Sequence, residues 1–384
     1  MARLAIISHK FDQPSETFIR DHVACLAPGD TALVARKGRP PAGCDGPFLA
    51  LGGKRHSPPY VLDYLVRRAL GLSRKPRPAR MTRRESARLQ AFVHRHDVTT
   101  VLVEHGHVGA EFADAVCAAG VRLFVHFHGH DANILARFPG FAERYHALFA
   151  QADGIVVTSS YMANRLTNLG CPEAKLIVCP VGIDTRRFAP ARDRPVAKRI
   201  VAIGRLIPLK GPLEAISAFT RVVEKHPDAH FDVIGDGPLR QRCIDHAREL
   251  GVGDRVHFHL AQPVDRVVEL LQGGSVFIQH GITQADGTAE AFGLAPLEAG
   301  ACGLPVVVTR HGGMAETVVD GQTGFIVAES DIGAMARAID MLLSEPDRAI
   351  AMGAKGRIRV QQNYDQADCC RQLARAMAIE NGPL

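Results

Sequence analysis

No apolar run in this chain approaches the about 18 residues that a helix needs to cross a bilayer, so the sequence predicts no membrane-spanning segment. The N-terminal stretch MARLAIISHKF has too short an apolar run for a secretory signal, and it ends in His-Lys instead of small residues. None of the nine cysteines forms a Cys-x-x-Cys pair, and their scatter among apolar segments is typical of reduced core thiols. These absences favour a cytoplasmic protein.

Length and composition set the scale of the fold. At 384 residues the chain is long for one hydrophobic core, so we expect two domains. Hydrophobic residues make up 46% of the sequence and charged residues 22%, as in an ordinary soluble protein. The chain has no internal repeats or low-complexity tracts.

The net charge of +6 is unevenly distributed. Segment 54–88 holds eleven basic and two acidic residues, a net +9, which leaves the rest of the chain near −3. Clustered Lys and Arg attract anionic lipid headgroups or a phosphate-bearing acceptor, and Tyr60 and Leu65 would make an amphipathic helix there. We therefore expect contact with an anionic membrane at its inner face, with a solvated basic surface as the alternative. Nucleic acid is disfavoured, because no binding motif accompanies the charge.

Short apolar runs recur along the first half of the chain, at 3–8, 31–35, 99–103, 121–127, 154–158 and 175–179. Helical or basic segments separate them, including a helix capped by Ser15. A second series begins at Arg199 with IVAIG and continues through HFDVIG, RVHFHL, SVFIQH and GFIVA. Strands that alternate with helices predict an α/β fold with parallel sheets covered on both faces.

Two acids stand out within 284–324. Glu290 and Glu298 are eight residues apart, and the pattern predicts a loop acid, then a helix acid, then a strand at Val306–Val308. If the residues between them were helical they would rise about 12 Å, whereas carboxylates that cleave a sugar between them lie roughly 5 to 9.5 Å apart. The pair therefore suits two parts of one elongated ligand, such as the ribose and hexose ends of a sugar nucleotide. An ordinary helix with a solvated acid is the alternative.

Arg205 and Lys210 follow a predicted strand and precede a helix that begins near Pro212. Phosphates bind at such places because free backbone N–H groups and the positive end of the helix dipole converge there. The two cations would hold a diphosphate and neutralise the charge that grows as it leaves. A solvated loop is the alternative. The later turn Gly235-Asp-Gly237-Pro is a weaker sign, since many α/β turns look alike.

Histidines cluster at two predicted strand ends, at 105–107 (HGH) and 126–131 (HFHGHD). Alternate residues of a strand share a face, so these clusters have the spacing of metal ligands. The second nearly spells the His-x-His-x-Asp-His box of metallo-hydrolases, but its last two letters are exchanged and no later histidine–acid set completes a site. We therefore expect no bound metal, and buried structural histidines are the alternative to a functional role.

The phrase EAFGLAPLEAGACGLPVV, which begins at Glu290, resembles the signature of glycosyltransferase family 4. Ala285-Asp-Gly287 ahead of it is similar to the colanic-acid and exopolysaccharide branch of that family. The resemblance implies a retaining, nucleotide-sugar-dependent hexosyltransferase of the GT-B fold, with two Rossmann-like domains facing across a cleft. Ala291 departs from the family pattern, in which glycine is most common.

The resemblance also implies roles for single residues. Glu298 would bind the ribose hydroxyls of the donor and Glu290 its hexose hydroxyls, while Arg205 and Lys210 match the family's diphosphate-binding pair. The phrase FHGHD is similar to polysaccharide-type members, where a first-domain histidine approaches the donor hexose. His128 is the first candidate for that role and His130 the second. Further donor contacts are expected at Gly235, Gly237, Phe292, Gly293 and Leu294.

No Asp-x-Asp occurs in the chain; the other large glycosyltransferase fold uses that pair to hold a metal against the diphosphate. With Arg205 and Lys210 present, this favours transfer without a metal or other cofactor. The acceptor hydroxyl, on a saccharide or a lipid-linked acceptor, would attack from the leaving-group face and pass its proton to a phosphate oxygen. Segment 15–19 (SETFI) also resembles polysaccharide-type members, but the family's glycine-rich acceptor loop is missing beside it. We expect a role in surface polysaccharide or related glycoconjugate synthesis.

Segment 180–184 (PVGID) is similar to the family's interdomain connection. We therefore expect a first domain over 1–182, a linker over 183–198, a nucleotide-sugar domain over 199–364, and a helix over 365–384 that crosses back to the first domain. Three other functions stay open. They are a sugar-nucleotide 2-epimerase of the same fold, a metal-dependent hydrolase built on 126–131, and a non-catalytic nucleotide-sugar binding module.

Overall fold

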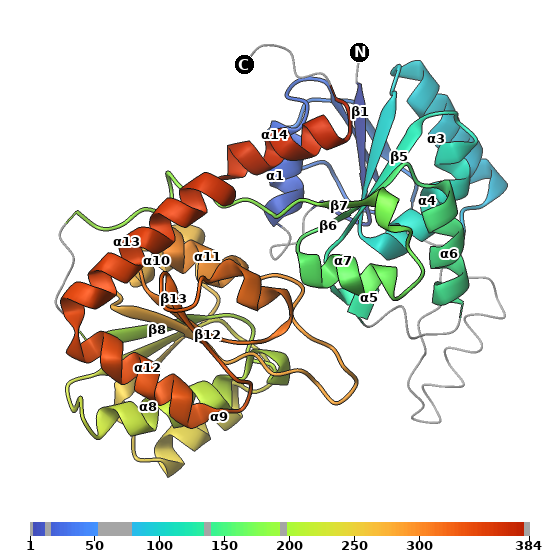
Figure 1. Ribbon diagram of the computed structural model, residues 1–384. Helices are drawn as coiled ribbons and strands as arrows, with labels where there is room; N and C mark the ends of the chain where they lie inside the picture. The colour runs from blue at the N-terminus through green and yellow to red at the C-terminus, as the bar shows by residue number, and fades with distance from the viewer. Residues whose placement is uncertain (1–2, 12–16, 53–78, 134–139, 193–197, 380–384) are drawn as a thin grey trace. The chain divides into compact units, whose positions relative to one another are not determined.

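The computed structural model describes residues 3–11, 17–52, 79–133, 140–192 and 198–379. The chain divides into two compact units (Figure 1). The first comprises Met1–Thr158, Met162–Cys179 and Cys370–Leu384, and the second comprises Ser159–Tyr161 and Pro180–Cys369. No helix among the described residues is both long and apolar enough to cross a membrane.

The first unit is built on a seven-stranded parallel sheet in the order β3-β2-β1-β4-β5-β6-β7. The strands are β1 (Leu4–Ser8), β2 (Thr31–Ala35), β3 (Phe48–Ala50), β4 (Thr100–Glu104), β5 (Arg122–Phe127), β6 (Gly154–Val157) and β7 (Leu176–Val178). The helices are α1 (Thr17–Cys25), α3 (Arg83–Arg95), α4 (Gly106–Cys117), α5 (His130–Asn133), α6 (Phe141–Gln151), α7 (Ser160–Thr167) and α14 (Gln366–Ala376). Only the part of α7 from Met162 onward and the part of α14 from Cys370 onward belong to the first unit.

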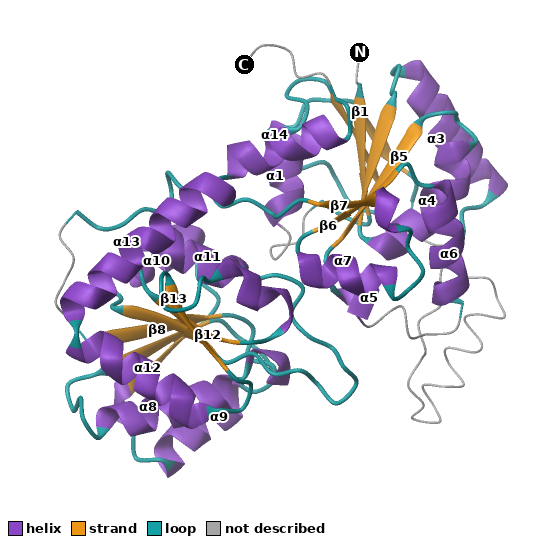
Figure 2. Ribbon diagram, in the orientation of Figure 1, coloured by secondary structure: helices purple, strands orange, loops and turns teal. Residues whose placement is uncertain are grey.

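The second unit is built on a six-stranded parallel sheet in the order β10-β9-β8-β11-β12-β13. The strands are β8 (Arg199–Ile203), β9 (His230–Ile234), β10 (Val256–His259), β11 (Val276–Gln279), β12 (Val306–Thr309) and β13 (Gly324–Val327). The helices are α8 (Pro212–Val223), α9 (Arg240–Glu249), α10 (Val264–Gln272), α11 (Leu294–Ala301), α12 (Ile332–Ser344) and α13 (Pro346–Asn363). Helices lie on both faces of the sheet in each unit (Figure 2).

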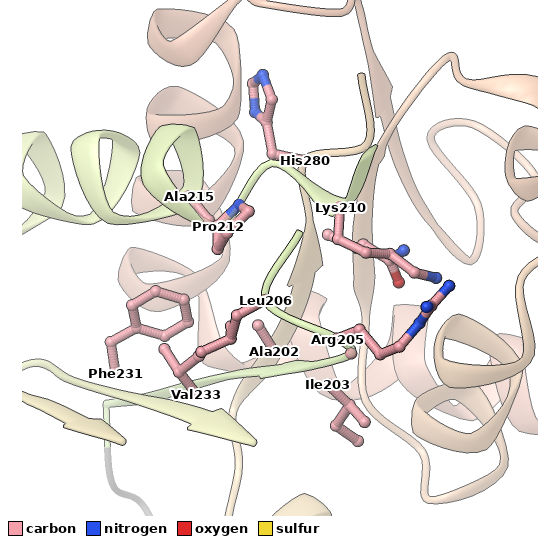
Figure 3. A pocket seen from close by; sticks show the side chains of 12 residues that line it. Ala202, Ile203, Arg205, Leu206, Lys210, Pro212, Ala215, Phe231, Val233 and His280 are labelled. Carbon is pink, nitrogen blue, oxygen red and sulfur yellow. The ribbon is translucent and has the colours of Figure 1, made fainter. Parts of the chain in front are cut away.

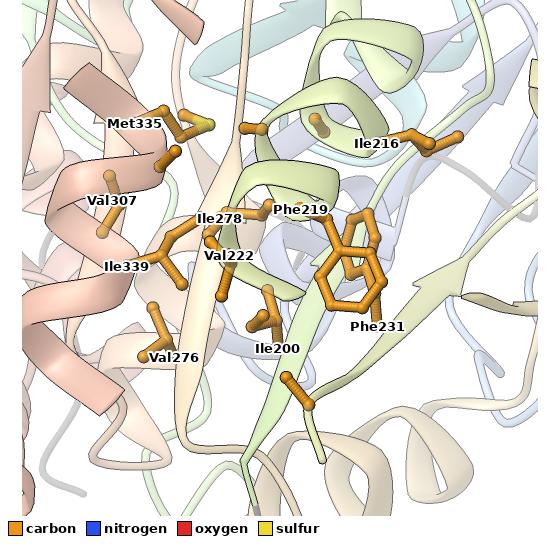
Figure 4. Packing of buried hydrophobic residues seen from close by; sticks show 14 of the residues in the cluster. Ile200, Ile216, Phe219, Val222, Phe231, Val276, Ile278, Val307, Met335 and Ile339 are labelled. Atoms are coloured by element: carbon orange, nitrogen blue, oxygen red, sulfur yellow. The ribbon is translucent and has the colours of Figure 1, made fainter. Parts of the chain in front are cut away.

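Alternate residues of the central strands pack into two hydrophobic layers, one on each face of the sheet. In the second unit, Ile200 of β8 and Val307 of β12 pack in the layer that contains α8, α9 and α12 (Figure 4). Their neighbours Val201 and Val308 pack in the opposite layer, with α10 and α11. Since side chains of a strand point alternately to opposite faces, a sheet covered on both faces needs an unbroken apolar run. This is why the strands could be read from the sequence, and the predicted α/β fold with parallel sheets is confirmed.

Several predictions fall partly or wholly on residues outside the described ranges. They include the helix cap at Ser15 and the part of the basic segment within 53–78, which contains Tyr60 and Leu65. The predicted linker is described except for 193–197.

The expectation that all nine cysteines are reduced is wrong. A disulfide joins Cys25, the last residue of α1, to Cys370 of α14, with 6.1 Å between their Cα atoms. Burial of Leu373 and Met377 holds α14 on the first unit, beside α1 (Figure 1), and so brings the two thiols together. The partners are 345 residues apart, and therefore no local spacing rule could reveal the pair.

Candidate functional site

Two loops of the second unit begin at the carboxyl ends of two neighbouring strands. β8 and β11 lie side by side where the order of the strands reverses direction. In open α/β sheets, ligands bind at this switch point, just outside the carboxyl ends of the strands. The loop after β8 carries Arg205 and Lys210, and the loop after β11 carries Glu290. The topology therefore brings the two predicted cations and the first predicted acid to one place.

The loop after β8 is shaped by a glycine at its end. Arg205 is exposed two residues beyond β8, and Lys210 ends a 3-10 turn that begins at Pro208. Gly211 adopts φ +57°, and a Cβ there would lie 1.8 Å from the carbonyl oxygen of His280. Only glycine permits this approach, which starts α8 directly beside the end of β11. The N-terminus of α8 is thereby fixed next to Lys210.

The predicted turn glycines support the same loop from its other side. Gly235 adopts φ +135°, and a Cβ there would lie 2.1 Å from the carbonyl oxygen of Gly204. A Cβ at Gly237 would lie 2.5 Å from the carbonyl oxygen of Leu206. Both glycines therefore pack against the residues that flank Arg205, and they help to set the path of its backbone.

A hollow of about 360 Å³ that is open to solvent lies beside the loop. Arg205 and Lys210 extend toward the same side of it, whereas Phe231 and Val233 line an apolar side (Figure 3). The buried side-chain amide of Gln279 lines it too, without a hydrogen-bond partner among the described residues. The remaining lining residues are Ala202, Ile203, Gly204, Leu206, Pro212, Ala215 and His280.

Lys210 links the two predicted acids. Its Nζ forms an ion pair with the carboxylate of Glu290. Its charge also acts on the half-buried Glu298, the fifth residue of α11. Burial nevertheless raises the pKa of Glu298 to about 7, because the lysine offsets the loss of hydration only in part. As predicted, the first acid lies in a loop and the second in a helix, but the segment between them is only partly helical.

The residues between the acids lead into α11. Phe292 is buried in the core, with its ring 6.0 Å from that of Tyr364. Its side chain therefore anchors the loop and faces core residues. Gly293 immediately precedes α11, and Leu294 is its half-buried first residue. The first N–H groups of a helix have no partner within it, so the backbone at these positions can contribute contacts to a donor.

The first unit gathers histidines around one buried acid. Glu104 is the last residue of β4, and it accepts hydrogen bonds from Nδ1 of His22 and Nε2 of His128, both at 2.7 Å. Burial opposes its ionisation, but the two imidazoles hold the pKa of Glu104 well below its usual range. Burial lowers the pKa of His128, and Glu104 restores it in part. The second candidate, His130, is exposed at the start of α5.

Among the residues that the structure describes, one group has donor atoms near enough to hold a metal. The donor atoms of His22, Glu104 and His126 all lie within 4.8 Å of one another. Burial lowers the pKa of His126 well below its usual value, so its ring is neutral. The metal box that the alternative hydrolase function would need does not assemble, because the carboxylate of Asp131 accepts hydrogen bonds from backbone N–H groups such as that of Gly106 (2.7 Å). That no metal takes part stays a prediction.

Neither Glu104 nor His22 was predicted from the sequence. For Glu104 a signal was present, because an acid that ends an apolar, fully buried strand needs hydrogen-bonding partners. For His22 there was none, since its role depends on the packing of α1 against the sheet.

Solved structures share this architecture at low sequence identity. HepE of Anabaena, crystallised with UDP, matches with a TM-score of 0.78 over 98% of this chain and 99% of its own, at 16% identity. A glycosyltransferase of Rickettsia africae matches with a TM-score of 0.76 over 98% of each chain, at 16% identity. Sucrose-phosphate synthase of Thermosynechococcus elongatus gives 0.71 over 98% of each chain, at 19% identity. The fold is that of the GT-B glycosyltransferases.

Family models and sequence relatives narrow this class. The model for glycosyl transferases group 1 matches residues 187–359, and that for glycosyltransferase family 4 matches residues 33–187. The GDP-mannose-dependent alpha-(1-6)-phosphatidylinositol monomannoside mannosyltransferase of Mycolicibacterium smegmatis is 33% identical over 73% of this chain and 76% of its own length. WcaL of Escherichia coli, named as a colanic acid biosynthesis glycosyltransferase, is 30% identical over 65% of this chain and 62% of its own. The chain belongs to glycosyltransferase family 4.

The protein is therefore a hexosyltransferase that uses a nucleotide-sugar donor, as the resemblance implied. The epimerase and the hydrolase are not favoured, because both family models and the relatives named above are those of transferases.

Proposed function

We propose that this protein transfers a hexose from a nucleotide sugar to a hydroxyl acceptor, with retention of the anomeric configuration and without a metal ion. The meeting of Arg205, Lys210 and Glu290 at the switch point of the second unit carries the proposal. Glu298 is electrostatically coupled to the same lysine. Two cations that suit a diphosphate thus adjoin two acids that suit sugar hydroxyls.

The proposed reaction balances without a protein base. The bond between the anomeric carbon and the diphosphate oxygen breaks, and the acceptor oxygen bonds to the same carbon on the same face. The acceptor proton passes to an oxygen of the released nucleoside diphosphate. Arg205 and Lys210 would offset the negative charge that grows on that diphosphate, which is the task of a metal in other sites.

The two acids would bind opposite ends of the donor. In this structure Lys210 pairs with Glu290. A bound diphosphate would compete for this lysine and leave the Glu290 carboxylate to accept hydrogen bonds from the hexose hydroxyls. Glu298 would accept hydrogen bonds from the two ribose hydroxyls, and it can accept with both of its oxygens only when it is ionised.

His128 is proposed to contact the donor hexose, with His130 as the second candidate. Since the ionised Glu104 only accepts hydrogen bonds, Nε2 of His128 carries the proton that it donates to Glu104. In the neutral ring, Nδ1 is then left as an acceptor for a sugar hydroxyl.

The names of the relatives support the proposed setting. One acts with GDP-mannose on a phosphatidylinositol monomannoside, and another is named for colanic acid biosynthesis. We propose a saccharide or lipid-linked acceptor in surface polysaccharide or related glycoconjugate synthesis. The work would take place in the cytoplasm at the inner face of the membrane, with segment 54–88 as the contact with anionic lipid.

Thermal-shift and turnover assays with UDP-glucose, GDP-mannose and ADP-glucose, each with and without EDTA, test the proposal. One class of donor is expected to raise the melting temperature and to release its nucleotide slowly, equally with and without EDTA. NMR of the glycoside product should show the anomeric configuration of the donor. No response to any donor would refute the donor site, an inverted product would refute retention, and loss of turnover in EDTA would refute metal independence.

A further inference from the structure

Three loops of the second unit meet around one histidine. His311 lies two residues beyond β12, and its side chain is fully buried. Glu290 lies in the loop after β11, and Glu329 lies two residues beyond β13. These three strands are neighbours in the order β11-β12-β13, so their loops emerge side by side at the carboxyl end of the sheet.

The ring of His311 connects the other two loops. Its Nε2 accepts a hydrogen bond from the backbone N–H of Glu290 at 3.0 Å, and its Nδ1 donates to the carboxylate of Glu329, also at 3.0 Å. The backbone N–H and the hydroxyl of Thr283 donate to the same carboxylate, both at 2.7 Å. These contacts fit one tautomer, a neutral ring with its proton on Nδ1. Glu329 thus selects the tautomer that leaves Nε2 free to accept from Glu290.

The two residues after His311, Gly312 and Gly313, contact the backbone carbonyl group of Glu290. The N–H of Gly313 donates to the carbonyl oxygen of Glu290 at 2.8 Å. Gly312 has φ +51°, and a Cβ there would lie 2.1 Å from the same oxygen. One short segment therefore binds both backbone polar groups of Glu290, while Lys210 pairs with its carboxylate.

We propose that His311, oriented by Glu329, is a positioning residue that fixes the Glu290 loop for the hexose of the donor. The inference rests on the proposed role of Glu290 as the residue that binds the hexose hydroxyls. Reacting groups must be held to a fraction of an ångström, and a displacement of about 1 Å can cost about 100-fold in rate. The residues between β11 and α11 form no helix or strand, so no regular pattern of backbone hydrogen bonds fixes the position of Glu290.

The two amide substitutions of His311 separate its two hydrogen bonds. In His311→Gln the side-chain amide reaches the position of Nε2 and can still accept from the Glu290 N–H. In His311→Asn the amide reaches only the position of Nδ1, so contact with Glu329 is kept and the acceptor for Glu290 is lost. If the proposal holds, Gln retains function and Asn does not, although both remove the imidazole.

Hydrogen–deuterium exchange on the donor-free variants gives a readout that does not depend on activity. Peptides that cover 284–297 should exchange faster in His311→Asn than in wild type, and His311→Gln should stay close to wild type. The turnover number with whichever of UDP-glucose, GDP-mannose or ADP-glucose the wild type uses should fall about 10- to 100-fold in Asn and far less in Gln. The dissociation constant of the matching nucleoside diphosphate should stay unchanged, since it lacks the hexose.

The outcomes separate this inference from the proposed function. Unchanged exchange over 284–297 in the Asn variant, or equal loss of turnover in Asn and Gln, would overturn the inference. Faster exchange in Asn together with a wild type that turns over no donor would instead overturn the proposed function. If circular dichroism shows that His311→Asn does not fold, the ¹⁵N chemical shifts of the His311 ring in the wild type replace it: a proton on Nδ1 and none on Nε2 is expected, and a proton on Nε2 would overturn the inference.

Discussion

Lys210 interacts with both predicted acids of the second unit. It pairs with the carboxylate of Glu290, and its charge partly offsets the effect of burial on the pKa of Glu298. Its ion pair with Glu290 is mostly shielded from water, with 22% and 19% of the two side chains exposed. Removing one partner of such a pair leaves the other charge poorly solvated. A substitution at either residue is therefore expected to disturb the whole of the proposed donor site.

Glu290→Gln should lower the turnover number by at least about 100-fold, the usual effect of losing one preorganised group that stabilises the transition state. The reason is that the amide neither pairs with Lys210 nor accepts hydrogen bonds as strongly as a carboxylate. Steady-state kinetics with the donor identified in the panel measures this. Glu224→Gln, an exposed change at the end of α8, is the matched control and should behave as wild type. Near-normal turnover in Glu290→Gln would remove Glu290 from the site.

Glu298 should make donor affinity depend on pH. Its pKa is raised to about 7 by burial, so in the donor-free protein it takes up a proton as the pH falls through about 7 and stops accepting from two hydroxyls. Calorimetric titration from pH 6 to 8.5 should show weaker donor binding at the acid end. In Glu298→Gln the affinity should be lower at pH 8 and nearly flat with pH. An equally steep profile in that variant would show that another group titrates.

The raised pKa of Glu298 also makes the free energy of unfolding depend on pH, in the opposite direction to donor affinity. Because the folded protein holds this proton more tightly than the unfolded chain, the contribution of Glu298 to the free energy of unfolding is fully present below its ordinary pKa of 4.5. That contribution is lost as the pH rises through about 7. The pH that favours donor binding is thus the pH at which this residue stabilises the fold least.

At the scale of elements, most strands could be predicted because burial on both faces demands an unbroken apolar run, as at β1 and β4. β3 was not predicted, because its three residues directly follow a segment rich in proline and glycine (38–47), which indicates a loop. The candidate site residues on the loops after β8 and β11 could be named from the sequence because each sits in a contiguous motif. His311 and Glu329 could not be, since their role exists only where three loops meet. The disulfide was also missed, because its two cysteines lie 345 residues apart in the sequence.

The described end of the basic segment offers a test of membrane contact. Arg83 and Arg84 are exposed at the start of α3, whereas Arg88 donates to the carbonyl oxygens of Leu51 and Ala50 and helps hold the chain beyond β3. Arg83→Gln with Arg84→Gln should therefore weaken binding to vesicles rich in phosphatidylserine about 10- to 30-fold in low salt, at about 1 kcal/mol per residue. Cosedimentation measures this.

A matched double change controls for net charge in that experiment. Arg240→Gln with Lys355→Gln removes two exposed charges from the second unit, and it should leave vesicle binding unchanged. Equal binding by the Arg83–Arg84 variant and the wild type would mean that these residues only face solvent.

At the scale of the whole molecule, the disulfide should stabilise the first unit. Cross-linking residues 345 apart removes much freedom from the unfolded chain, and native disulfides typically contribute about 2–5 kcal/mol. Cys25→Ser with Cys370→Ser should lower the melting temperature by several degrees, and dithiothreitol should lower that of the wild type equally. Cys44→Ser, at a free half-buried thiol, is the control. No change in either case would mean that the bond adds nothing to stability.

The membership of Cys370 in the first unit also bears on how the protein is made. Domains usually fold in the order in which they leave the ribosome, at about 5–20 residues per second. Here the partner of Cys25 follows 345 residues later, a delay of roughly 20 to 70 s at those rates. The first unit therefore lacks its last helix until the whole second unit has been synthesised. The unit that starts first is completed last, and a nascent chain that stops short of α14 would leave a nearly complete second unit joined to an incomplete first unit.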